Sequence, residues 1–132
     1  MTILIDTPGE FANRNWVRFP APGSPGQELW HFTGNAVFSF RGESEDHWRY
    51  EELIILPPES PVFSRFSQWA YMAAPSAIYN QGSANNAGWA VDSVNLYANP
   101  GRAGIRCSIA VRDTDGYLYR VAYHIVVVGV PT

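Results

Sequence analysis

The chain has 132 residues and a net charge of −3, with 14% aromatic and 16% charged residues. This length is typical of a single domain, but a charged fraction of about 25% is usual, so we expect a surface that is partly neutral or covered by a partner. All nine basic residues are arginine, which excludes chemistry that needs a lysine amine. The weak negative charge, without runs of like charge, argues against nucleic acids and anionic membranes as partners.

The first residues lack the positive start and apolar run of a signal peptide. No apolar stretch approaches the roughly 20 residues of a membrane-spanning helix. We therefore expect no membrane span and a cytoplasmic location by default, with secretion by another route left open. The single Cys107 excludes an internal disulfide and any site built from several cysteines.

Short apolar stretches between turns rich in proline and glycine predict an all-β chain. The segment 66–81 is compatible with a strand or with a short helix that ends before Pro75. We predict one domain over residues 1–132, an antiparallel β-sandwich or jelly roll of about eight strands, with a closed β-barrel as the alternative. The clearest strand patterns lie near residues 15–19, 28–40, 48–56, 62–72, 89–97, 104–113 and 117–129.

The loop before the third of these strands holds Glu45, Asp46 and His47, a cluster that a metal site can use. A solvated loop is the more common origin of such a cluster, so we predict no metal site and no cofactor. In the strand that follows, Glu51 and Glu52 point to opposite faces and cannot flank one glycosidic bond.

The middle of the chain is dense in aromatic and amide side chains. Rings that pack against the C–H face of a sugar, with amides that bind its hydroxyls, form the usual site for a neutral carbohydrate. The alternatives are that these rings belong to the core or line a subunit interface. The residues of the predicted lectin-like site are Trp69, Tyr71, Asn80, Asn85, Asn86 and Trp89.

Near the C-terminus, Asp113-Thr114-Asp115-Gly116 is compatible with a calcium loop or a turn between strands. Calcium needs six or more oxygen ligands and usually a bidentate acid further along, which this segment lacks. A hairpin turn is therefore favoured, although a weak calcium site shared with a loop such as that holding Glu43 stays open. With a three-residue loop, the last two strands pair as a hairpin that places Cys107 opposite Tyr123 on an apolar face.

The opposite face of that hairpin carries Arg106, Arg112, Arg120 and His124. We predict an anion-binding cluster there, since arginine binds carboxylates and phosphates bidentately. An ordinary solvent-exposed face is the alternative. If Asp92, Glu51 or Glu52 neutralises these guanidinium groups from an adjacent strand, the surface is an ordinary solvent-exposed face; if none does, it is an anion site. The run from residue 124 to 130 is apolar on both faces, so we expect this strand to be central in its sheet or covered by a second subunit.

Three functions follow from these patterns. The first is a non-enzymatic, lectin-like module that binds a carbohydrate or another small molecule, and that we expect to be a homo-oligomer. The second is a structural, self-assembling β protein whose aromatic surface is its interface. The third is a small barrel enzyme with an apolar pocket and His31 or His124 as general base beside a carboxylate.

Overall fold

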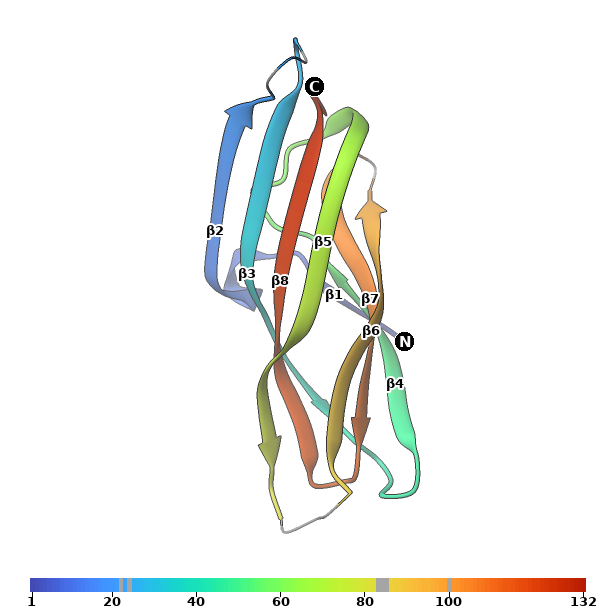
Figure 1. Cartoon of the computed structure of the whole chain (residues 1–132). Helices are drawn as coiled ribbons and strands as arrows, with labels where there is room; N and C mark the ends of the chain where they lie inside the picture. Colours follow the sequence, from blue (N-terminus) through green and yellow to red (C-terminus); the bar gives the residue numbers. More distant parts are fainter. Residues whose placement is uncertain (22, 24, 83–85, 100) are drawn as a thin grey trace.

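The computed structural model describes residues 1–21, 23, 25–82, 86–99 and 101–132. Its strands form two four-stranded sheets that pack face to face as a β-sandwich (Figure 1). The first sheet consists, in spatial order, of β1 (Thr2–Ile5), β4 (Trp48–Ile55), β7 (Ala103–Arg112) and β6 (Gly88–Ala98). The second sheet consists of β2 (Phe11–Pro20), β3 (Glu28–Arg41), β8 (Gly116–Pro131) and β5 (Phe63–Asn80), and the 3-10 turn η1 (Pro8–Glu10) lies between β1 and β2.

The predicted β-sandwich is confirmed, and the closed-barrel alternative is wrong because the two sheets are hydrogen-bonded separately. Neighbouring strands are antiparallel, apart from the parallel pair of β1 and β4. The sequence did not predict β1, since four residues are too few to show a periodic pattern.

The core lies between the sheets and follows from alternation along the strands. Cys107 and Ile109 of β7 are buried from one side, and Tyr123 and Ile125 of β8 are buried from the other. Gly34 of β3 leaves room for the large Tyr123 side chain, because a Cβ at this position would lie 2.7 Å from the tyrosine hydroxyl. The interior is thus filled by side chains of both sheets.

The predicted hairpin of the last two strands is wrong. β7 pairs with β4 and β6, whereas β8 pairs with β3 and β5, so the turn at residues 113–115 crosses from one sheet to the other. The predicted inward side of each strand is nevertheless correct. Cys107 and Tyr123 are both buried in the core, although their strands belong to two different sheets and not to one hairpin. Pairing with strands on both sides satisfies the backbone groups of β8, which confirms the prediction that it is central.

The ambiguous segment 66–81 forms most of β5, a strand of 18 residues. Pro75 lies at a register shift of this edge strand, where a missing backbone N–H is tolerated. β6 and β7, which follow each other in the chain, pair antiparallel. The described part of the chain includes no helix with the length and apolar character needed to cross a membrane.

Candidate binding surface

The residues of the predicted lectin-like site do not form one site. Tyr71 and Asn80 lie on the same strand, nine positions apart, which corresponds to about 30 Å along β5. Trp89 is the second residue of β6, near the Asn80 end of β5, and Asn86 is exposed in the preceding loop. Asn85 lies outside the described residues.

The three predicted aromatic rings also differ in exposure. Tyr71 and Trp89 are partly buried and pack against the core, and the indole N–H of Trp89 is buried without a partner among the described residues. Trp69 is 52% exposed. Packing therefore accounts for two of the three rings, and carbohydrate recognition stays a prediction.

The predicted anion-binding cluster is divided between the two sheets. Arg106 and Arg112 lie on β7, whereas Arg120 and His124 lie on β8 in the opposite sheet. The Arg106 Nε lies 3.3 Å from Glu52 Oε2 on the adjacent strand, which is the neutralisation expected of an ordinary solvent-exposed face. The structure brings together no cluster of all four residues, because the hairpin on which it depended does not form.

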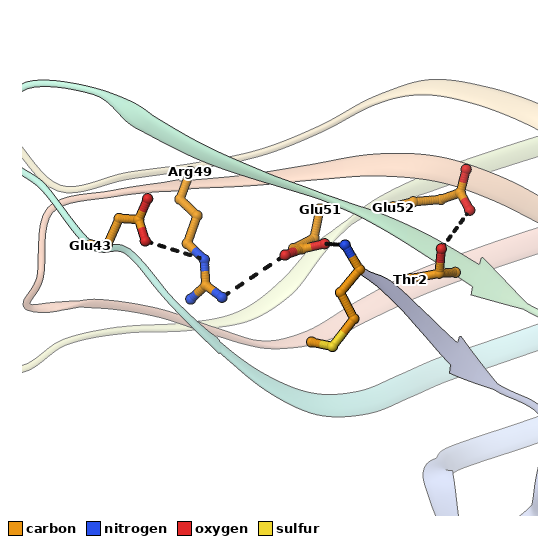
Figure 2. Close-up of polar contacts among 6 residues, drawn as sticks. Thr2, Glu43, Arg49, Glu51 and Glu52 are labelled. Carbon is orange, nitrogen blue, oxygen red and sulfur yellow. Dashed lines mark hydrogen bonds and ion pairs between the residues drawn. The ribbon is translucent and has the colours of Figure 1, made fainter.

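Further charges of β4 are compensated within the same part of the molecule (Figure 2). Arg49 lies between Glu43 and Glu51, with N···O distances of 3.9 and 4.0 Å, and Glu51 also pairs with the N-terminal amine at 3.2 Å. Glu52 accepts a hydrogen bond of 2.9 Å from Thr2 Oγ1. Mutual pairing of this kind is typical of a surface that stays in water.

The turn at residues 113–115 is held by its own hydrogen bonds. Asp113 is buried with φ +80°, its carboxylate accepts a hydrogen bond from the Asp115 amide, and its carbonyl accepts one from the Gly116 amide. The Asp113 amide donates to the carbonyl of Ser44, so the two acidic loops do meet. Among the described residues, no group of three or more histidine, cysteine or acidic side chains is arranged to hold a metal ion.

The outer face of the second sheet is of a different kind. Phe19, Leu29 and Val128 are cross-strand neighbours and form one row across the sheet. In the next row, His31 lies between Val17 and Val126. Phe19 is 53% exposed and Val17 is 42% exposed. We call this surface the apolar face, and its residues are Val17, Phe19, Leu29, Met72, Val126 and Val128.

No arginine or acid points outward within these rows of described residues. Arg18 of β2 points to the inner side, over the ring of Trp30, and Arg120 lies beyond the apolar face on β8. Asn15, Thr33 and Gln68 are neutral outward positions at its margin, whereas the exposed Arg65, opposite Val130, places a charge at the same margin. The apolar face is thus hydrophobic, with no arginine or acid within its rows of described residues.

A histidine pair lies within the apolar face. His31 Nε2 is 3.3 Å from His124 Nδ1, because His124 is opposite Thr33, the outward neighbour of His31 on β3. A shallow hollow of about 250 Å³ lies beside the pair, floored by Val126 and bounded by Met72. A smaller hollow borders His31 on the β2 side.

This histidine pair does not match the predicted enzyme site. That hypothesis requires a deep pocket with a histidine beside a carboxylate. Among the described residues, the polar contact of His31 and His124 is the one between their rings. The run at residues 124–130, apolar on both faces, suggested a central strand or a covered outer face for β8, but it gave no sign that β3 brings His31 beside His124.

A tyrosine cluster at the far end of the second sheet was also missed. The rings of Tyr117 and Tyr119 are stacked with their centroids 5.6 Å apart, and the Arg41 guanidinium lies 5.3 Å from the Tyr117 centroid. The Tyr117 hydroxyl donates a 3.0 Å hydrogen bond to Gln81 Oε1. These rings contact one another, so their faces are less available to a ligand than their number suggests.

Comparison with known proteins gives no match: no family model, no curated protein and no solved structure is significantly similar to this chain.

Proposed function

We propose that this protein is a non-enzymatic β-sandwich module that self-associates through the apolar face of its second sheet. The observation that carries the proposal is the exposure of large apolar side chains on a regular sheet without an outward charge among them. Phe19, Val17 and Met72 are 53%, 42% and 61% exposed. Burial of such side chains against a partner removes apolar surface from water.

The size of the apolar face supports an interaction role. Four strands about 4.8 Å apart, followed over about five residues, cover roughly 300 Å². Patches of about 300–600 Å² on a monomer often mark interaction sites, and a standard interface buries about 800 Å² on each partner. Protruding side chains such as Phe19 and Met72 increase the area that contact can bury.

A second copy of the chain is the partner that this surface fits best. A two-fold interface places the same patch on both sides, so a neutral apolar face meets a neutral apolar face. A charged partner would instead be recognised by complementary charges, which the outward rows lack. Two sheets pack face to face at about 10 Å, and the outer side of the second sheet offers this geometry to its own copy.

Sedimentation velocity at micromolar concentrations tests the proposal. We expect the wild-type chain to be a dimer or a larger oligomer, and Met72→Glu to shift it to the monomer because the interface would bury an unpaired carboxylate. Leu4→Glu is the matched control, since Leu4 is 48% exposed on the edge strand β1 of the other sheet. A monomeric wild type, or equal effects of the two variants, would overturn the proposal.

A further inference from the structure

We propose that His31 and His124 form half of a binding site for a divalent transition metal ion such as Zn²⁺, which the same pair of a second copy completes. This inference rests on the proposed self-association through the apolar face. It assigns a ligand to the histidine pair within that face.

The spacing of the two ring nitrogens fits a shared metal ion. Zinc–nitrogen bonds of about 2.0–2.1 Å in a tetrahedral site place two ligand nitrogens about 3.3–3.4 Å apart. His31 Nε2 and His124 Nδ1 are 3.3 Å apart. Imidazole is a preferred ligand of zinc, copper and nickel, so both the atom type and the separation match.

One chain cannot complete this site. Among the described residues, no third histidine, cysteine or acid joins the pair in a metal-binding group. Thr33 and Met72 lie opposite His124 on the neighbouring strands, and neither belongs to the usual zinc ligands. Two further ligands therefore have to come from solvent or from another molecule.

A second copy on the apolar face supplies them at a suitable distance. An imidazole nitrogen lies about 4 Å above its sheet, and the metal bond adds about 2 Å, which places the ion about 5–6 Å from each sheet. Sheets packed face to face are about 10 Å apart, so the midplane lies near this height. Four neutral imidazoles leave the ion its double charge, and the hollow beside His31 and His124 gives water or an anion access to it.

Zinc titration followed by calorimetry and sedimentation velocity tests the inference. We expect one Zn²⁺ per two wild-type chains and at least tenfold tighter dimerisation with zinc than with EDTA. His31→Gln and His124→Gln should each abolish the zinc effect. His47→Gln is the control, because this third histidine lies in the loop between β3 and β4, beyond the end of β3 opposite to His31.

The outcomes separate this inference from the proposed function. A dimer that forms in EDTA and binds no zinc would overturn the metal site and leave self-association intact. Zinc binding that the His31 and His124 variants retain would also overturn it. A chain that is monomeric with and without zinc would overturn both proposals, whereas a dimer that forms only with zinc would support the metal site.

Discussion

The two outer faces of this sandwich differ in the placement of their charges. On the first sheet, Arg106 is paired with Glu52, and Glu52 also binds Thr2. On the second sheet, the corresponding rows carry exposed Val17 and Met72 with no outward charge among the described side chains.

This difference shows that a common architecture does not give the two sheets a common environment. Charged groups that compensate one another are adapted to water, whereas apolar side chains on a regular sheet gain free energy only when something covers them. The first sheet therefore has the character of a surface that stays in water, and the proposed self-association assigns the contact role to the second sheet. Single substitutions can test this division.

The largest effect is expected on the free energy of unfolding, when a buried side chain and an outward side chain of the same strand are compared. Ile125 of β8 is fully buried, whereas Val126 beside it points outward. In the Met72→Glu background, which is expected to be monomeric, Ile125→Ala should lower the free energy of unfolding by about 2–5 kcal/mol, and Val126→Ala by about 1 kcal/mol or less. Urea denaturation measures both, and equal losses would show that Val126 is not on an outer face.

The next prediction concerns the interior that the two sheets share. Burial raises the pKa of the Cys107 thiol to about 12, with a smaller contribution from Asp92. Burial also raises the pKa of the Tyr123 hydroxyl, and Glu59 adds to the shift. An unfolded thiol deprotonates near pH 8.5, so above this pH the unfolded chain binds fewer protons than the folded chain.

Stability should therefore fall with rising pH, by up to about 1.4 kcal/mol per pH unit for the thiol between pH 8.5 and 12, and it should be insensitive to this thiol below pH 8.5. Cys107→Ala should be less stable but have a shallower slope, and Tyr123→Phe should reduce the loss above about pH 10. Urea midpoints at several alkaline pH values measure the slopes. An unchanged slope in Cys107→Ala would contradict the burial of the thiol.

A smaller effect is expected on the free energy of dimerisation, measured separately from folding stability. With the Met at position 72 retained, Val126→Ala removes two methyl groups from each side of the proposed interface and should weaken dimerisation about tenfold or more. Sedimentation equilibrium in EDTA measures the dissociation constant. An unchanged constant would place the interface elsewhere on the molecule.

The smallest effect is expected on the first sheet. The Arg106 and Glu52 side chains are 51% and 39% exposed, so their coupling free energy should be below about 1 kcal/mol and should decrease with salt. A double-mutant cycle of Arg106→Gln and Glu52→Gln measures it. These variants should leave dimerisation unchanged, and a loss of the dimer would contradict the division between the two faces.

The sequence by itself determined which side of each late strand is buried. Alternation fixes that Cys107 and Tyr123 share the interior, because a strand turns successive side chains to opposite faces whatever its partner. It also determined the all-β class. Because residues 124–130 are apolar on both sides, it left two explanations for this strand, a central position or a covered outer face, and the strand order shows the central position.

Only the tertiary structure decided which strands are neighbours. The same burial of Cys107 and Tyr123 is compatible with one hairpin or with two facing sheets, and the backbone hydrogen bonds of β8 to β3 and β5 select the second. That choice separated Arg106 from His124 and brought His31 beside His124. The contacts join residues far apart in the chain, and local periodicity carries no information about such pairing.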